Sequence, residues 1–192
     1  MYTNVSNIVD TVILVINTQR ESIDKLLHTY VEDSCLNIIK GNRKVIPDSA
    51  MPSLEIEPVS ATTEWATLRA QRPRYELSLK LSVRNSNEDY GVEYITSIAN
   101  FISQILTNPL NLQLKIVNEV KWDLNEGLVE TYILDSFSDN VSYSASKDGS
   151  IRTAEFNWWC VVHETYPDWW HSKYNTGETR FPTIIQPTPR NI

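Results

Sequence analysis

Residues 74 to 83 constrain the fold more than any other part of this sequence, because polar and apolar side chains alternate there without a break. The apolar positions are Tyr75, Leu77, Leu79, Leu81 and Val83. A period of two is typical of a strand that buries one face and exposes the other. At about 3.3 Å per residue, this strand would be roughly 33 Å long. The sequence therefore predicts a long, half-buried strand that needs a covering layer.

Residues 89 to 106, which follow this strand, predict an amphipathic helix. The apolar side chains that recur at helical spacing are Tyr94, Ile95, Ile98, Ala99, Ile102, Ile105 and Leu106. Ser86 and Asp89 stand at the spacing of a capping box, and Asn108 and Pro109 end the pattern. At about 1.5 Å per residue the helix would span roughly 27 Å, so it could cover the preceding strand.

The N-terminal part of the chain predicts a second helix and an edge strand. From Ile8 to about residue 32, apolar residues recur at intervals of three and four, which favours one helix, either straight or interrupted near residues 17 and 18. The alternative is a short strand over residues 11 to 16 before a helix. Residues 54 to 59 predict a strand that Pro58 cuts short at an edge of the sheet. The polar residues 60 to 73 then predict a turn or protruding loop.

The second half of the chain predicts further strands. They cover residues 112 to 117, 128 to 135, 141 to 144 and 151 to 166. Asp148 and Gly149 predict the turn before the last strand, because Asp-Gly favours the positive φ angles of a type I′ turn. Trp158 and Trp159 are adjacent and must face opposite sides of a strand, so only one of them is expected in the core.

Residues 167 to 192 differ from the rest, because prolines interrupt them and no periodicity is sustained. They still carry the apolar side chains Trp169, Trp170, Tyr174, Phe181, Ile184 and Ile185. Ordering such a segment costs conformational entropy, so these side chains are expected to contact the chain's own domain or a partner. We therefore predict an α+β domain over residues 1 to 166 and an extended arm over residues 167 to 192. The domain should hold a mainly antiparallel sheet of four to five strands with a long hairpin, covered on one face by two helices.

The charge of the chain bears on its partners. With 24 acidic and 17 basic side chains, the formal net charge is −7. Affinity for DNA comes largely from Lys and Arg side chains that neutralise phosphates, so tight nucleic-acid binding is not expected. The apolar run at residues 12 to 16 is far shorter than the roughly 18 residues that a membrane span needs. No basic region or small-residue cleavage site precedes it, so a secretory signal is not expected. The sequence therefore predicts no membrane partner and synthesis in a cytoplasm.

No pattern in the sequence points to catalysis. Cys35 and Cys160 are too few for a disulfide framework and are expected to be buried thiols. Cys160 and His163 are three residues apart on a predicted strand, so they face opposite sides and form a poor metal pair. The five glycines provide no phosphate loop, dinucleotide fingerprint or nucleophile elbow. We therefore expect no cofactor, no metal and no enzymatic activity.

The order of these elements resembles that of the tail terminator, or tail completion, proteins of tailed bacteriophages and of the related neck connectors. The resemblance covers about residues 5 to 166. It rests on the N-terminal helix, Pro52 and the strand at residues 54 to 59, the strand at residues 74 to 83, the helix at residues 89 to 106 with Asn108 and Pro109 after it, and the Asp-Gly hairpin.

This resemblance implies a virion protein whose copies form a ring, commonly of six subunits, that caps the finished tail tube. The partners it implies are further copies of the chain, tube and sheath proteins, and connector proteins of the neck and head. Glu119, Asp123 and Glu126 would face an axial channel through which DNA slides, and the arm would cross to a neighbouring subunit.

Two other functions stay open at this point. An adjacent neck or head-completion connector would share the architecture, and both the arm and residues 60 to 73 depart from a minimal tail terminator. A glycan-binding module, which belongs to another class of protein, would use exposed tryptophans such as Trp169 and Trp170 as stacking platforms.

Overall fold

The computed structural model of the 192-residue chain describes residues 5–31, 34–41, 47–67, 70–84, 88–108, 131–147 and 149–165. The helices are α1 (Val5–Thr18), α2 (Arg20–His28), the short 3-10 helix η1 (Asp48–Ala50) and α3 (Glu88–Thr107). The strands are β1 (Asn37–Lys40), β2 (Ser53–Thr67), β3 (Ala70–Arg84), β4 (Thr131–Ser138), β5 (Ser142–Ala145) and β6 (Ile151–Thr165).

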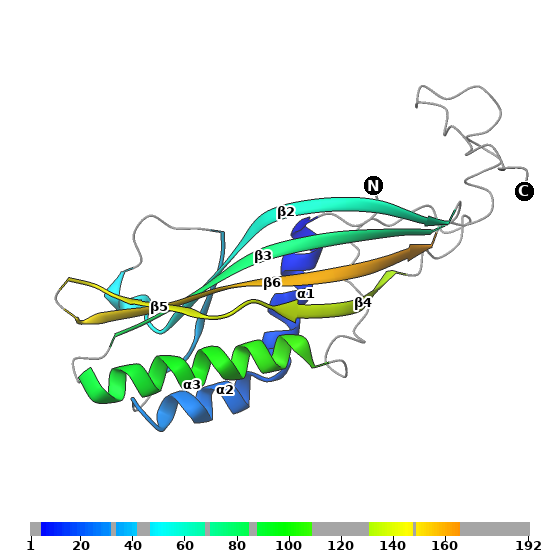
Figure 1. Ribbon diagram of the computed structural model, residues 1–192. Coiled ribbons are helices and arrows are strands. Elements are labelled where there is room, and N and C mark those ends of the chain that lie inside the picture. The colour runs from blue at the N-terminus through cyan, green and yellow to red at the C-terminus, as the bar shows by residue number, and fades with distance from the viewer. Residues whose placement is uncertain are drawn as a thin grey trace, which may run out of the picture.

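The strands form one sheet in the order β1-β2-β3-β6-β4, and β5 pairs with the part of β6 that β4 does not reach (Figure 1). Only β1 and β2 are parallel among the described pairs; the others are antiparallel. The three longest strands, β2, β3 and β6, have 15 residues each and are neighbours in the sheet. The predicted α+β fold with a mainly antiparallel sheet is confirmed, although the described sheet has six strands rather than four or five.

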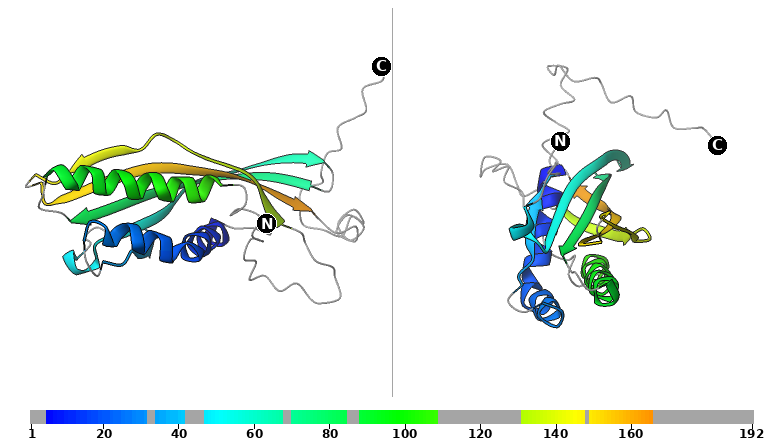
Figure 2. Two further views of the ribbon diagram at one scale, coloured as in Figure 1. Left: turned by 90° about the horizontal axis from the view of Figure 1, so that it is seen from below. Right: turned by 90° about the vertical axis from the view of Figure 1, so that its left-hand side faces the viewer.

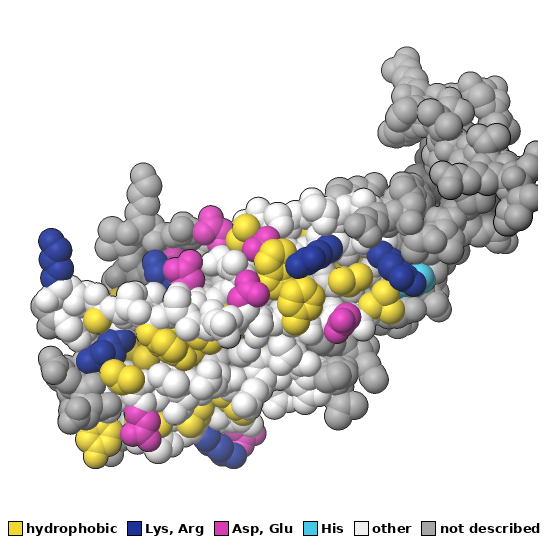
Figure 3. Space-filling view, in the orientation of Figure 1, with side chains coloured by type: hydrophobic (Ala, Val, Ile, Leu, Met, Phe, Trp, Pro, Cys, Tyr) yellow, Lys and Arg dark blue, Asp and Glu magenta, His cyan; other side chains and the backbone are white. Residues whose placement is uncertain are grey.

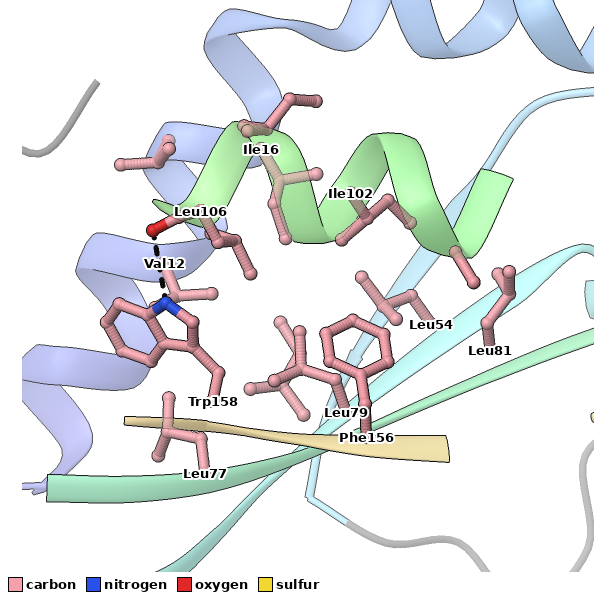
Figure 4. Close-up of a cluster of buried hydrophobic side chains, with 14 of the residues drawn as sticks. Val12, Ile16, Leu54, Leu77, Leu79, Leu81, Ile102, Leu106, Phe156 and Trp158 are labelled. Carbon is pink, nitrogen blue, oxygen red and sulfur yellow. Dashed lines mark hydrogen bonds between the residues drawn. The ribbon is translucent and has the colours of Figure 1, made fainter. Parts of the chain in front are cut away.

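The α-helices pack on one face of this sheet (Figure 2). The alternation predicted for β3 is confirmed, because its five apolar side chains, from Tyr75 to Val83, are fully buried. Figure 4 shows Ile102 and Leu106 of α3 and Ile16 of α1 above the apolar residues of the sheet. The core therefore lies between the helices and the sheet. This follows from the apolar side chains, which repeat every two residues in the strands and about every 3.6 residues in the helices.

The N-terminal helix is interrupted close to the predicted place, and the alternative of a short strand there is wrong. α1 ends at Thr18 and α2 begins at Arg20. Gln19 between them has φ −104° and ψ 12°; its N–H donates to the Ile16 carbonyl at 3.1 Å, and its carbonyl accepts from Ser22 at 3.0 Å. The break turns the chain between two helices that both contribute buried apolar residues to one core.

The prediction of a protruding loop at residues 60 to 73 is wrong. β2 continues to Thr67 and β3 begins at Ala70, so the two strands form one long hairpin in which Thr62 pairs with Arg74. This end of the hairpin extends past the helices (Figure 2), and residues 61 to 63 are exposed. A strand outside the core needs no apolar alternation, because its backbone pairing holds it in place.

Pro58 does not end β2, although the prediction of an edge position is correct for most of the strand. β1 pairs only with residues 53 to 56 of β2, so the outer side of β2 is open from Glu57 onward in the described sheet. Pro58 lies in this open part, next to a break in the register between Pro58 and Ser60. Proline is compatible with an edge strand at a bulge, because its missing N–H removes no bond from the ladder.

The hairpin before β6 is present, but its turn is not the predicted type I′ turn. The Gly149 N–H donates to the Ser146 carbonyl at 2.9 Å, and the Ser146 N–H donates to the Ile151 carbonyl at 2.8 Å. Lys147, and not Gly149, therefore lies at a central position of the turn. Gly149 has φ +70° and leads the chain from the turn into β6, a place that favours glycine.

The two cysteines have different environments. Cys160 is buried as predicted, and this burial raises the pKa of its thiol to about 12. Cys35 is exposed, so the prediction of a second buried thiol is wrong. Its neighbours Ser34 and Leu36 are buried, and the extended chain between α2 and β1 turns Cys35 outward.

Some predicted elements lie outside the described residues. They include the strand at residues 112 to 117, the capping residue Ser86 and the arm at residues 167 to 192. The division of the chain into a domain and an arm therefore stays a prediction.

Candidate assembly surfaces

The sheet face opposite the α-helices carries the outward side chains of three strands, and we call it the open face. Its members are Arg74, Glu76, Ser78 and Lys80 of β3, Glu155, Asn157, Trp159, Val161 and His163 of β6, and Asp135 and Phe137 of β4. All of them are partly or fully exposed. Figure 3 shows basic, acidic and apolar side chains side by side over this region. The alternation that buries one face of β3 thus produces a mixed, accessible surface on the other face.

Three side chains of the open face form what we call the arginine–aromatic cluster: Arg74, Phe137 and Trp159. The Cζ atom of Arg74 lies 4.1 Å from the centroid of the Trp159 ring and 5.2 Å from that of Phe137. The two rings stack with centroids 6.0 Å apart and planes at 12°. The Trp159 indole N–H also donates to Asp139 Oδ2 at 3.4 Å. Cation–π attraction and stacking therefore hold side chains from β3, β6 and β4 in one arrangement.

Glu76 organises the neighbouring part of the open face. Its Oε2 accepts a hydrogen bond from the Ser60 hydroxyl at 2.8 Å, and its Oε1 accepts one from the Asn157 amide at 3.2 Å. The carboxylate thereby joins β2, β3 and β6 across the sheet. Because both of its oxygens have neutral donors, Glu76 is a fixed acceptor on this surface.

Glu55 and Lys80 form a further charged pair on the same side of the sheet. The Glu55 side chain is 3% exposed, and its Oε2 lies 3.7 Å from Nζ of Lys80, which is 41% exposed. Lys80 follows the alternation of the open face, whereas Glu55 is buried beside it. The pair places a buried negative charge next to an accessible positive charge.

An open pocket of about 310 Å³ lies between α3 and the β5–β6 hairpin. Its lining residues are Val92, Ile95, Thr96, Tyr143, Ser144, Ala145 and Arg152. Gly91 allows Arg152 to pass closely, because a Cβ at position 91 would lie 2.5 Å from the Arg152 Nε. Arg152 is the one ionisable side chain besides Tyr143 in this lining, so the pocket does not bring an acid and a base together.

The two outer edges of the sheet carry exposed apolar side chains. Val59 on β2 is 54% exposed, and Leu134 and Phe137 on β4 are 45% and 39% exposed. Edge strands also present backbone N–H and C=O groups that can pair with another chain. Both edges are therefore candidate contact surfaces.

Among the described residues, no group of three or more His, Cys, Asp and Glu side chains could hold a metal ion. Cys160 and His163 lie on opposite faces of β6, as predicted, because Cys160 is buried and His163 is partly exposed.

Tyr94 of α3 is buried, and this burial raises the pKa of its hydroxyl group. A hydrogen bond to Ser34 lowers this pKa by a smaller amount.

All nine residues predicted from the sequence as contact or channel positions lie outside the described residues. They are Trp169, Trp170, Tyr174, Phe181, Ile184 and Ile185 of the arm, and Glu119, Asp123 and Glu126. Their roles stay predictions.

Sequence reasoning did not find the arginine–aromatic cluster. Arg74 was visible only as one polar position in an alternating strand, and Phe137 lay outside the predicted strand at residues 128 to 135. The one usable signal was that Trp158 and Trp159 must face opposite sides. The strand register was needed to place Phe137 and Arg74 on either side of Trp159.

Two solved structures are distantly similar to this chain. No family model matches the sequence, and no curated protein matches it. A chain in the solved virion of a native gene transfer agent particle has 9% identity and a TM-score of 0.47, over 76% of this chain and 90% of that chain. A second solved protein has 12% identity and a TM-score of 0.40, over 80% of this chain and 96% of its own length. Neither likeness assigns a function to this chain.

Among the described residues, no helix is both long and apolar enough to cross a membrane.

Proposed function

We propose that this protein is a structural, non-enzymatic component of a tailed phage or phage-like virion, and that its copies form a ring at the end of the tail tube. The observation that carries the proposal is the difference between the two sheet faces. Helices cover one face, while the open face presents side chains fixed by stacking and by hydrogen bonds between strands. Arginine, tryptophan and phenylalanine are enriched at protein interfaces, so the arginine–aromatic cluster suits contact with another protein.

A ring requires two different and complementary surfaces on each subunit. The described domain offers the open face and two unlike sheet edges, and the arm would add Trp169, Trp170 and further apolar side chains. In this proposal the ring has six subunits, caps the tube and recruits connector proteins of the neck and head. A neighbouring position in the neck would use the same surfaces.

The acidic balance of the chain fits a ring through which DNA passes. Glu119, Asp123 and Glu126 would face the channel, and a chain with a formal charge of −7 would repel the phosphate backbone. DNA would then slide through the ring without tight binding. The protein would be made in the host cytoplasm and would end in the virion.

Electron microscopy and light scattering test this function directly. The full chain is measured over a range of concentrations, alone and with tail tubes purified from the producing particle. The expected result is rings in solution or at the ends of tubes. A protein that stays monomeric and also fails to bind tubes would contradict the proposal.

A double variant tests the role of the arm in ring formation and distinguishes this role from the glycan-binding alternative. Trp169→Ala with Trp170→Ala should weaken ring formation, because two apolar contact side chains are lost. Tyr90→Ala is the matched control, since Tyr90 is an aromatic residue of α3 that is 58% exposed and has no assigned role in the ring. Binding to a glycan array that disappears in the double variant, with no effect on association, would support the glycan-binding module instead.

A further inference from the structure

We propose that neighbouring copies join edge to edge in the ring, with the open part of β2 from one copy paired to β4 of the next. This inference rests on the proposed function, since it names the subunit contact of the same ring. It would make the sheet continuous from one subunit to the next. The position, direction and backbone orientation of the two edges support this pairing.

The two edges lie at opposite sides of one sheet. β4 is the last strand on one side, and on the other side β1 covers only residues 53 to 56 of β2. Residues 57 to 67 of β2 and residues 131 to 138 of β4 therefore have no partner strand on their outer sides within the described chain. Open edges of this length are rare in monomers unless a device protects them.

The open part of β2 is level with β4 across the sheet. At one end, Thr131 pairs with Glu164, which pairs with Gln71, which pairs with Trp65. At the other end, Ser138 pairs with Trp158, which pairs with Leu77, which pairs with Pro58. β4 thus spans the same height as residues 58 to 65 of β2. A rotation about an axis along the strands would bring these two segments side by side.

The strand directions are also compatible. β2 and β6 run one way, and β3 and β4 run the other way, because each neighbouring pair is antiparallel. Copies related by a rotation about an axis along the strands would therefore place β2 antiparallel to β4. The contact is heterologous, because it joins two different surfaces, and a heterologous contact builds closed rings or open filaments.

Hydrogen bonds show which backbone groups point outward from β2. The Gly41 N–H donates to the Ile56 carbonyl at 2.8 Å, so the backbone of Ile56 faces the outer side of β2. Two residues further, Pro58 faces the same side. The register then shifts by one residue before Ser60, which turns the backbone groups of Ala61 and Thr63 outward.

The outer edge of β4 holds a protecting carboxylate. The Asp139 N–H donates to the Asn157 carbonyl at 2.9 Å, so the backbone of Phe137 also faces β6 and those of Ser136 and Ser138 face outward. The Ser136 N–H donates to Asp135 Oδ1 at 2.8 Å. In the paired state a carbonyl of the next β2 would replace this carboxylate. Asp135 thus limits pairing of the free subunit, as charged residues at edges do.

Cysteine cross-linking between copies tests the pairing. In a Cys35→Ser background, which removes the exposed native thiol, Phe137→Cys is combined with Ser60→Cys or with Thr62→Cys, so that two neighbouring registers are sampled. The expected product under oxidation is a ladder of dimers, trimers and larger species that disappears on reduction. The variants that carry only one of the two introduced cysteines are the controls and should give no ladder; the buried Cys160 stays in all of them. A disulfide-linked dimer from either single variant would indicate a twofold contact and would overturn the inference.

A backbone variant tests the same contact without cysteines. Ala61→Pro removes an outward N–H from β2 and should weaken association about tenfold or more, because a ladder bond is lost and the proline ring obstructs pairing. Ala61→Val keeps the N–H and should associate like the natural protein. Asp135→Ala should strengthen association, since the Ser136 N–H is then uncovered. Circular dichroism of each variant checks that the fold is retained, and unchanged association of a folded Ala61→Pro variant would overturn the inference.

The outcomes separate this inference from the proposed function. If rings form but no cross-linked ladder appears, or if rings persist in the Ala61→Pro variant, the edge contact is contradicted and the proposed ring still stands. A protein that forms no rings and does not bind tail tubes would contradict both the edge contact and the proposed function. If cross-linked species appear but electron microscopy shows no closed rings, edge pairing in a filament is supported and a ring that caps the tube is contradicted.

Discussion

Trp158 and Trp159 are adjacent in the sequence but belong to two different regions of the molecule. Trp158 is fully buried against the helices, and its indole N–H donates to the Leu106 carbonyl near the end of α3 at 3.1 Å. Trp159 lies on the open face, where its ring stacks with Phe137 and the Arg74 guanidinium lies over both rings. The same residue type thus stabilises the fold on one face and shapes an accessible surface on the other. The difference shows that β6 serves both purposes through the alternation of its side chains.

The largest expected effect is at Trp158. Trp158→Ala should lower the free energy of unfolding by about 3–5 kcal/mol, because it leaves a cavity and removes one of the two hydrogen bonds to the Leu106 carbonyl, which also accepts from the Ser136 hydroxyl at 3.0 Å. Urea denaturation of the full chain measures this change. Trp159→Ala is the matched control on the open face and should cost about 1 kcal/mol. Equal losses for the two variants would break the contrast between the faces.

A second pair of neighbours sharpens the contrast on β3. Leu79 is fully buried, and Leu79→Ala should cost about 2–5 kcal/mol. Ser78 contacts Glu155 on the open face at 3.4 Å, and Ser78→Ala should change the stability by less than about 0.5 kcal/mol. Thermal denaturation of both variants provides the measurement. A loss above about 1 kcal/mol for Ser78→Ala would mean that the open face contributes to folding.

The buried thiol gives the covered face a pH dependence. In the folded chain the pKa of Cys160 is raised to about 12, whereas the unfolded chain releases this proton at its ordinary pKa of about 8.5. Unfolded chains then bind fewer protons than folded ones, so stability should fall as the pH rises from about 9 toward 12. The raised pKa of Tyr94 acts in the same direction. Urea midpoints measured from pH 7 to pH 10.5 should fall less steeply in Cys160→Ala, and parallel curves would contradict this origin.

A small effect is expected at Arg74 on the open face. Arg74→Ala should lower the stability by about 0.5–1 kcal/mol, because an exposed cation–π contact contributes little. It should change the fluorescence of the folded protein, since the guanidinium leaves the face of the Trp159 ring. Arg74→Lys is the conservative control and should cost less than the alanine variant. A loss above about 2 kcal/mol would mean that the cluster belongs to the fold.

The sequence was sufficient for elements whose side chains repeat with a clear period. β3 and α3 were predicted within a few residues because each has one continuous apolar side. The same reasoning failed for residues 60 to 67, which form a strand that lies outside the core. β1 was also missed, because four residues are too few to show a period.

Taken alone, the sequence determined which residues turn toward a core and which turn away, because the geometry of a strand or helix fixes that choice locally. Only the tertiary structure decided which strands are neighbours, that Arg74 meets Phe137 and Trp159, and that β4 and the part of β2 beyond β1 lie at the edges. These contacts join residues that are tens of positions apart. They depend on strand order and register, which no local pattern in the chain specifies.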